Sequence, residues 1–143
     1  MATLYTIGFA GKTEEEFYKI LRDAGVRCIW DIRLWRDSVS EYFAWAKGSY
    51  LAARCGHKYK WAKELAPTVE LLSGVKEKRM ALADAFAEIE KLLSERRIET
   101  LFLQTNLDGA CLMCSEKSAD NCHRKIVAEY LARRFPRLKI RHL

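Results

Sequence analysis

The apolar residues of this 143-residue chain follow two patterns: short unbroken runs, and longer stretches in which they recur every three or four positions. Short runs at residues 3–7 and 26–33 predict buried strands. Between them, Thr13 and Glu16 form the pattern of a helix-capping box, and Gly25 suits the end of that helix. A strand, a helix and a strand with short connections predict a parallel pair.

The second half of the chain continues this alternation. We expect a helix over residues 76–97, where apolar residues recur at helical spacing, and strands over residues 98–104 and 110–114. A last helix is expected to begin near Asn121, and residues 138–143 form a closing strand. The alternation predicts a three-layer α/β fold with a Rossmann-like, mostly parallel sheet and helices on both faces.

The segment between the two halves, residues 34–63, is less regular and rich in aromatic residues. We expect a short helix capped by Ser49 and closed by Gly56, followed by a short strand over residues 57–61. Aromatic side chains suit a pocket wall, a core or a dimer contact, and the pattern does not separate these roles. No linker stands out, so residues 1–143 are predicted to form one domain.

The composition is that of a soluble globular protein, with 50% hydrophobic and 31% charged residues. No apolar run approaches the roughly 18 residues that a membrane-spanning helix needs. The N-terminus lacks the basic start and apolar stretch of a signal peptide, so we expect a cytoplasmic protein. Five cysteines, an odd number, argue against a complete disulfide framework and favour thiols or metal ligands.

The net charge of +6 is concentrated at one end of the chain. Residues 122–143 hold seven basic residues and one acid, Glu129, and so carry the whole excess. A basic segment of this kind favours a nucleotide or nucleic-acid partner. The alternative, given equal weight, is a solvated helix face and tail. The oligomeric state is left open by the sequence, with a dimer among the options.

The densest chemistry lies in CSEKSADNCHR, residues 114–124. Cys114 ends a predicted strand, and residues 122–124 fall in the first turn of the last helix, capped by Asp120 or Asn121. In open α/β sheets, ligands bind at this place, outside the carboxyl ends of the strands. The free N–H groups and the dipole of the helix favour an anion there, and they also favour a thiolate.

One hypothesis for this segment is a reactive thiol. Cys114 or Cys122 would be the nucleophile, with His123 as base or proton donor and Glu116 as orienting group or acid. Arg124 would hold an anionic substrate or leaving group. These parts fit a thiol- or acid–base-assisted transferase or hydrolase.

A second hypothesis is a metal site, because Cys111, Cys114, Cys122 and His123 supply the four ligands of a zinc centre. The spacing weighs against it: Cys111 and Cys114 would face opposite sides of a strand, and Cys122 and His123 would lie about 100° apart on a helix. A loop conformation would remove both objections. The third alternative is structural, since buried cysteines are common in cores, and Cys28 is typical of them together with Cys55 and Cys111.

A second polar cluster stands at the end of the second predicted strand. Asp31 and Arg33 are separated by Ile32, so their side chains point to one face. If this strand neighbours the Cys114 strand, the two clusters would meet, with Asp31 as acid or base and Arg33 as ligand-binding group. The alternative is a mutual salt bridge. Gly8, after the first strand, would allow a ligand to approach the backbone, or would only form a turn.

Five short motifs together point to a known family: YTIG at residues 5–8, Asp-x-Arg at 31–33, Cys-x-Glu at 114–116, Cys-His-Arg at 122–124, and a short strand ending near a histidine at 140–143. The chain resembles the family called domain of unknown function 488. The resemblance implies a compact α/β fold with a polar site formed by these motifs. It supplies no particular reaction, and the cofactor is left unknown.

The leading hypothesis is therefore a protein that binds or acts on a phosphate-bearing ligand, either a nucleotide or nucleic acid. The alternative is a metal-stabilised module without chemistry of its own that binds nucleic acid. The site residues expected in the leading hypothesis are Gly8, Asp31, Arg33, Cys114, Glu116, Cys122, His123 and Arg124.

Overall fold

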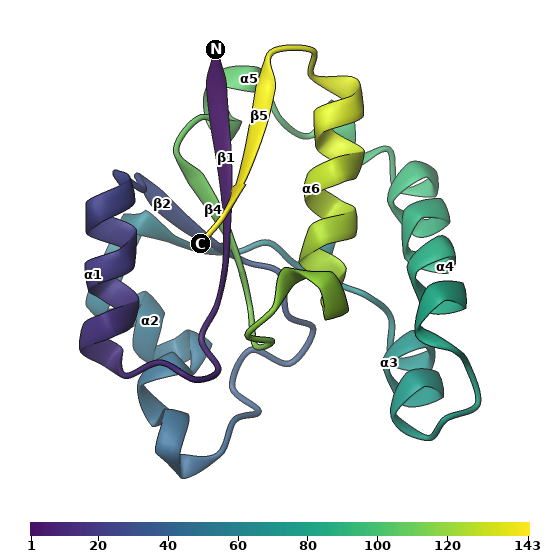
Figure 1. The fold of residues 1–143 in the computed structure, drawn as a ribbon, viewed down its shortest axis with the longest axis horizontal. Coiled ribbons are helices and arrows are strands. Elements are labelled where there is room, and N and C mark those ends of the chain that lie inside the picture. The colour runs from purple at the N-terminus through teal and green to yellow at the C-terminus, as the bar shows by residue number, and fades with distance from the viewer.

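The computed structural model, which describes residues 1–143, is built around one five-stranded sheet (Figure 1). The strand order is β3-β2-β4-β1-β5, and every neighbouring pair is parallel. The strands are β1 (Ala2–Gly8), β2 (Cys28–Asp31), β3 (Tyr59–Trp61), β4 (Ala110–Cys114) and β5 (Leu138–His142). The expected mostly parallel sheet is confirmed, and it is parallel throughout.

Helices cover both faces of this sheet, as the alternation predicts. They are α1 (Glu14–Ala24), α2 (Gly48–Cys55), α3 (Val69–Lys76), α4 (Leu82–Glu95), α5 (Gln104–Leu107) and α6 (His123–Arg134). In Figure 1, α1 and α2 lie on one side of the sheet, and α6 lies on the other with α3 and α4 beyond it. Two separate cores fill the spaces between the layers. The fold is therefore the expected three-layer α/β arrangement.

The central strand β4 divides its side chains between the two cores. Cys111 and Met113 pack in the core of the α1/α2 face, whereas Leu112 and Cys114 pack in the core of the α4/α6 face. This alternation follows from the pleat of a strand that is buried on both sides. The expectation that Cys111 and Cys114 face opposite ways is confirmed.

Helix α1 begins and ends where the sequence indicates. The Glu16 backbone N–H donates to Thr13 Oγ1 over 3.1 Å, and the Thr13 N–H donates to the Glu16 carboxylate over 2.9 Å. Gly25 ends the helix in the left-handed region, at a φ of 77°. Both features were predicted from residue type alone, because capping depends on neighbours along the chain.

The strand expected over residues 98–104 is wrong. Arg97 turns the chain at a φ of 51°, and the following residues form a 3-10 turn at Ile98–Thr100 and then α5. Ile98 and Phe102 are buried in the core of the α4/α6 face, while Leu101 and Leu103 between and after them are exposed. Burial four residues apart is helical spacing, so packing overrides the strand preference of these residues.

The helix expected over residues 76–97 is confirmed only for Leu82–Glu95, which form α4; residues 77–81 are a turn after α3, a helix that the pattern does not predict. Helix α3 ends at Lys76, and α4 begins at Leu82. Lys78 has a φ of 59°, and the carbonyl of Gly74 accepts the N–H groups of Arg79 and Met80, which reverses the chain. The two helices pack against each other as a hairpin.

The short helix in the aromatic segment is present, but the Ser49 cap is wrong. Lys47 holds the cap position of α2, and the Ser49 N–H and hydroxyl both donate to the Asp37 carboxylate, each over 2.9 Å. Gly56 closes the helix at a φ of 57°, as expected. Membrane insertion through a helix has no support in the fold, because none is long and apolar enough to cross a bilayer.

Candidate functional site

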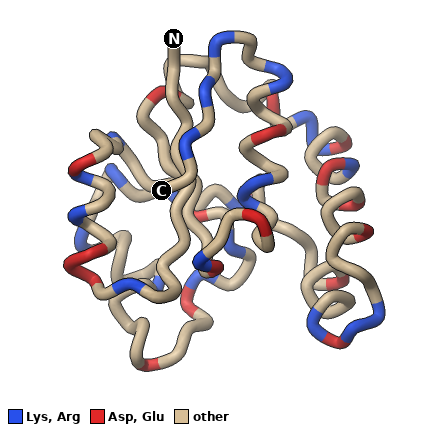
Figure 2. Tube along the Cα trace, viewed as in Figure 1, with Lys and Arg blue, Asp and Glu red and all other residues tan.

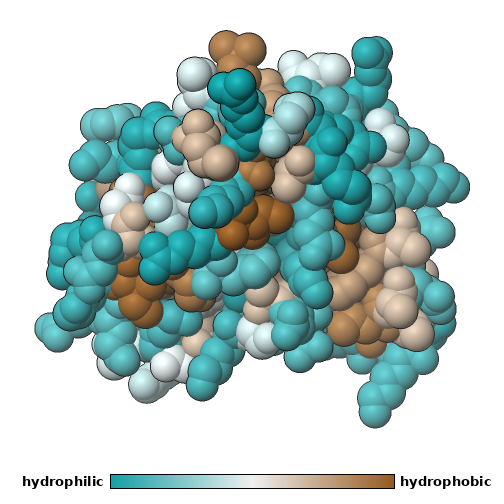
Figure 3. All heavy atoms as spheres, turned by 45° about the horizontal axis from the view of Figure 1, so that its top comes forward, coloured by the Kyte–Doolittle hydropathy of each residue, from teal (hydrophilic) through white to brown (hydrophobic).

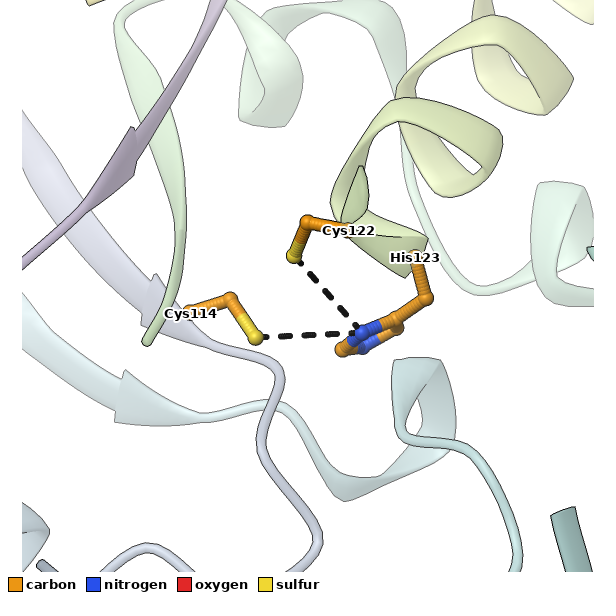
Figure 4. Close-up of side chains that lie close together, drawn as sticks. All are labelled: Cys114, Cys122 and His123. Carbon is orange, nitrogen blue, oxygen red and sulfur yellow. Dashed lines mark hydrogen bonds between the residues drawn. The ribbon is translucent and has the colours of Figure 1, made fainter. Parts of the chain in front are cut away.

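The segment after β4 brings two cysteines and a histidine together by an unexpected local conformation. Cys122, rather than Asp120 or Asn121, holds the cap position of α6, and its backbone is extended, with φ −126° and ψ 141°. His123 is the first residue of the helix. Because Cys122 is not helical, the expected separation of about 100° between the two side chains does not apply. Both point toward Cys114 (Figure 4).

These three side chains, Cys114, Cys122 and His123, form the Cys/His cluster. Nδ1 of His123 lies 3.8 Å from the sulfur of Cys114 and 4.0 Å from the sulfur of Cys122. The ligand atoms all lie within 4.8 Å of one another. The exposed fractions are 8%, 2% and 9%, so the cluster is buried. All five cysteines of the chain are free thiols, and Cys111 is on the other face of the sheet.

The backbone carbonyl of Ile32, just after β2, fixes the orientation of the His123 ring. Nε2 lies 3.0 Å from the carbonyl oxygen of Ile32, which can only accept a hydrogen bond. Nε2 therefore carries the proton, and in the neutral ring Nδ1 presents a lone pair to the two sulfurs. A sequence cannot show this contact, because Ile32 and His123 are far apart along the chain.

The two thiols of the cluster differ in acidity. The pKa of Cys114 is lowered, chiefly because the Cys122 thiol donates to it, and also by the Ser115 N–H and the charges of Arg124 and Arg33, against the opposing effect of burial. The pKa of Cys122 is raised by the same hydrogen bond and by burial. Cys114 is thus the more acidic of the two thiols, and the thiolate is the form that acts as a nucleophile or binds metal.

The Cys/His cluster lines a pocket of about 370 Å³ between the end of β4, the start of α6 and the α3–α4 hairpin. Of its 19 lining residues, 11 are hydrophobic, and most of these come from α3 and α4. In Figure 3, a group of hydrophobic residues is exposed on the side of the molecule where α3 and α4 lie. The charged lining residues are Arg33, Lys76 and Glu116. The pocket is therefore an apolar cleft with polar groups at one end.

Gly8 is required for packing within the chain. It pairs with Cys114 across the sheet, and a Cβ at this position would lie 1.5 Å from the carbonyl oxygen of Glu116. The sequence suggested that Gly8 would let a ligand come close to the backbone. In the structure, the Glu116 carbonyl of the loop after β4 occupies that position instead. The Glu116 side chain itself is exposed, lines the pocket and makes no hydrogen bond to the Cys/His cluster.

Arg124 holds the same loop in place. Its side chain is fully buried and donates to the carbonyl oxygens of Glu116 and Lys117 over 2.7 and 3.2 Å, and to Thr6 Oγ1 over 3.3 Å. Thr6 Oγ1 also lies 2.6 Å from Nδ1 of His142. The expected ligand-binding arginine therefore makes contacts that fix the loop, and it is not among the residues lining the pocket.

Asp31 and Arg33 pair with each other, as the salt-bridge alternative expected. Arg33 donates from Nε and Nη2 to the two carboxylate oxygens over 2.9 and 2.7 Å, and the Tyr59 hydroxyl donates to Asp31 over 2.6 Å. Burial and this last bond raise the pKa of Tyr59. Strands β2 and β4 are neighbours, but Asp31 pairs with Met113 and so faces the α1/α2 side, opposite the Cys/His cluster.

Arg33 connects the two sides of the sheet. It lines the pocket with the Cys/His cluster, although its Nε and Nη2 are engaged by Asp31 and by the Ala46 carbonyl. Its third nitrogen, Nη1, is buried and has no hydrogen-bond partner. This nitrogen is shielded from the pocket, and the guanidinium lies over the Phe9 ring of the α1/α2 core, 5.3 Å from its centroid.

The basic residues of the C-terminal segment are spread along α6 and β5 (Figure 2). Arg124 is inside, Arg133 pairs with Glu90, and Arg134 pairs with Glu99. None of its seven basic residues lines the pocket. The solvated-face interpretation therefore describes much of this segment.

Several pocket residues were not indicated by the sequence. Leu71, Leu72 and Val75 line the pocket from α3, a helix that the pattern did not predict. The aromatic segment divides its roles: Trp35 lines the pocket, whereas Phe43 and Trp45 pack against Phe9 and other rings in the α1/α2 core.

Comparison with known proteins gives a family and no characterised relative. A family model described as domain of unknown function DUF488 matches residues 13–131, so the chain belongs to this family. The matched range includes the Asp31–Arg33 pair and the whole Cys/His cluster, and it leaves out residues 5–8 and 140–143. No curated protein and no solved structure matches the chain.

Proposed function

We propose that this member of the DUF488 family binds a small phosphate-bearing molecule with an apolar portion, such as a nucleotide, in the pocket beside the Cys/His cluster. One observation carries the proposal: an apolar pocket has a polar end where Lys76 and the first turn of α6 lie, beside Arg33. The pocket volume of about 370 Å³ lies within the range of small-molecule sites.

The polar end of the pocket suits an anion. Arg33 is one of the residues lining this end, although its guanidinium is paired with Asp31. The first turn of the twelve-residue helix α6 lies at the same end, where free backbone N–H groups and the helix dipole favour negative charge. Lys76 adds an exposed positive charge at the pocket.

The other end of the pocket suits an apolar group. Its wall is formed by side chains of the α3–α4 hairpin, among them Leu72, Val75 and Phe86. Trp35 is 52% exposed and lines the same pocket, so its ring offers a face on which a base could stack. A single nucleotide fits this arrangement better than a nucleic-acid strand, because the basic C-terminal residues lie away from the pocket.

In this proposal, chemistry on the ligand belongs to the Cys/His cluster. Cys114, Cys122 and His123 all line the pocket, together with Glu116. Asp31, the other candidate acid or base, is fully buried on the opposite face and has its oxygens engaged by Arg33 and Tyr59. Asp31 thus supports Arg33 rather than the reaction.

The test is a titration of the full chain with inorganic phosphate and with adenosine monophosphate, followed by amide chemical shifts in NMR spectra. We expect saturable shifts around residues 33–38, in the 114–124 segment and along the α3–α4 hairpin. Lys76→Gln should weaken binding by about 3- to 10-fold, since it removes one partly screened charge contact. Lys139→Gln, which removes an exposed lysine on β5, is the matched control and should bind as the parent chain does.

Two results would contradict the proposal. One is the absence of saturable shifts with either probe. The other is a response that centres on β5, disappears in Lys139→Gln and falls steeply with salt, which would indicate nucleic-acid-type binding by the basic segment.

A further inference from the structure

We infer that Cys114, Cys122 and His123 together hold a zinc ion, with its fourth coordination position facing the pocket. The three ligand atoms come from the end of β4 and the start of α6 and converge within 4.8 Å. Thiolate sulfur and imidazole nitrogen are the ligands that zinc prefers in proteins. The inference about the fourth position rests on the proposed function, whereas binding of the ion does not.

The spacing of the three atoms matches tetrahedral coordination. Zinc–sulfur bonds of about 2.3 Å and zinc–nitrogen bonds of about 2.0–2.1 Å place sulfur and nitrogen about 3.6 Å apart in a tetrahedron. The observed sulfur–nitrogen distances are 3.8 Å to Cys114 and 4.0 Å to Cys122. Each sulfur and the ring nitrogen could therefore share an ion after movements of a few tenths of an ångström, and the two sulfurs lie within 4.8 Å of each other, against about 3.8 Å in a tetrahedron.

The His123 ring is held in the form that binds metal. Its Nε2 proton is engaged by the Ile32 carbonyl at 3.0 Å, which leaves Nδ1 unprotonated toward the sulfurs. Histidine ligands of zinc usually make such a hydrogen bond through their other nitrogen, because it fixes the tautomer and the ring orientation.

The charges around the cluster also suit the ion. Two thiolates would neutralise Zn²⁺, so the filled site would carry no net charge and would cost little to bury. Two buried guanidinium groups, those of Arg33 and Arg124, act on Cys114 in the direction that favours its thiolate. Binding would release the protons of the thiols to solvent.

The number of protein ligands separates this site from a structural zinc centre. Structural sites almost always have four protein ligands, whereas catalytic sites have three and leave one position for water or substrate. Cys111, the fourth ligand of the sequence hypothesis, is buried in the core across the sheet. All three members of the cluster line the pocket, so the fourth position would face a bound phosphate oxygen or water.

The experiment uses the full chain, reduced, stripped of metal and titrated with Zn²⁺ and with Co²⁺ as a spectroscopic substitute. We expect one ion per chain, with tetrahedral visible bands and a thiolate-to-cobalt charge-transfer band. Cys114→Ser, Cys122→Ser and His123→Ala should each weaken zinc binding by at least about 100-fold, since loss of second-shell partners alone costs 10–100-fold. Cys111→Ala is the matched control and should retain full affinity.

A second readout on the unaltered chain keeps the test decisive if a variant fails to fold. Alkylation of each cysteine, measured by mass spectrometry, should show that zinc protects Cys114 and Cys122 and leaves the rates at Cys28 and Cys55 unchanged. The inference is overturned if no cobalt–thiolate band forms, if the three variants bind zinc as tightly as Cys111→Ala, or if zinc gives no protection.

Adding inorganic phosphate to the cobalt-loaded chain tests the fourth position separately. A shift of the visible bands that saturates with phosphate would support an open position. Unchanged bands, in a chain whose NMR titration shows phosphate binding in the pocket, would overturn the open position and leave the proposed function intact. Tight zinc binding without phosphate binding in either measurement would overturn the proposed function and the open position, and leave the three-ligand zinc site.

Discussion

Two buried polar clusters stand at the same edge of the sheet, and they differ in what their polar atoms face. Asp31, Arg33 and Tyr59 form the Asp31 cluster on the α1/α2 side, where both carboxylate oxygens accept hydrogen bonds from the chain itself. The Cys/His cluster lies on the other side and lines a pocket. Both clusters are buried. The Asp31 cluster uses its polar atoms within the fold, whereas the Cys/His cluster keeps two sulfurs and a ring nitrogen that face one another beside a pocket.

The largest effect is expected from breaking the Asp31 cluster. Asp31→Ala would leave the Arg33 guanidinium buried without its counter-ion, which typically costs about 3–5 kcal/mol of unfolding free energy. Urea unfolding measures this. Asp23→Ala is the control, because it removes an aspartate whose ion pair with Lys19 is exposed, and it should change stability little. Equal effects of the two substitutions would show that the Asp31 cluster is not a structural support.

A somewhat smaller loss is expected from Gly8→Ala. The added Cβ meets the Glu116 carbonyl oxygen, so the loop braced by Arg124 must move, at a cost of up to about 3 kcal/mol. Gly25→Ala is the matched control: it has a φ of 77° but nothing within 4 Å, so its cost is that of backbone strain, about 1 kcal/mol. Thermal unfolding should rank Gly8→Ala as clearly the worse. The reverse order would contradict the account of this loop.

Tyr59→Phe sharpens the comparison by separating stability from metal binding. Removing the hydroxyl that donates to Asp31 should cost about 1.5–3 kcal/mol, the range for hydrogen bonds to charged groups. Its zinc affinity should equal that of the parent chain, because Tyr59 lies on the opposite face from the Cys/His cluster. Unfolding and zinc titration on the same sample give both values. A loss of zinc affinity without a loss of stability would reverse the roles assigned to the clusters.

The smallest effect concerns pH. Burial and the charge of Arg124 lower the pKa of His142, whose Nδ1 lies beside the Thr6 hydroxyl. Because the His142 pKa is lower in the folded state, the unfolded state binds more protons as the solution is acidified. The contribution of His142 to stability is therefore fully present above the ordinary histidine pKa of about 6.5, and it is lost as the pH falls from there toward the lower pKa of the folded state. In metal-free protein, His142→Asn should flatten the decline in stability between about pH 7 and pH 5. An unchanged decline would assign it to other groups.

Features of the fold could be predicted from the sequence when they depend on residues that are close together along the chain, and not when they depend on distant contacts. The capping box at Thr13, the end of α1 at Gly25 and the alternation along β4 rest on neighbouring residues, and the sequence indicated all three. The break between α3 and α4 depends on a left-handed Lys78, which no residue type announces. Residues 98–104 have strand-forming side chains, but their burial is set by packing under α4 and α6 rather than by local preference.

The site shows the same division. The place of Cys114 beside the first turn of the last helix could be predicted, because one lies at a strand end and the other at a helix start, whereas the spacing weighed against Cys122 and His123 pointing the same way. The separation of Asp31 from Cys114 could not, because it depends on the pairing of Asp31 with Met113, and a shift of one residue would exchange the faces. The extended backbone of Cys122 was likewise hidden, although it decides whether Cys122 and His123 can share an ion.

The most direct measurement is X-ray absorption at the zinc edge of the full chain loaded with one equivalent of Zn²⁺. The account predicts two sulfur neighbours at about 2.3 Å and two lighter neighbours at about 2.0–2.1 Å, of which one is the His123 nitrogen and the other is exchangeable. A spectrum with only oxygen and nitrogen neighbours, or with three or more sulfurs, would contradict the assignment of the Cys/His cluster as a three-ligand metal centre.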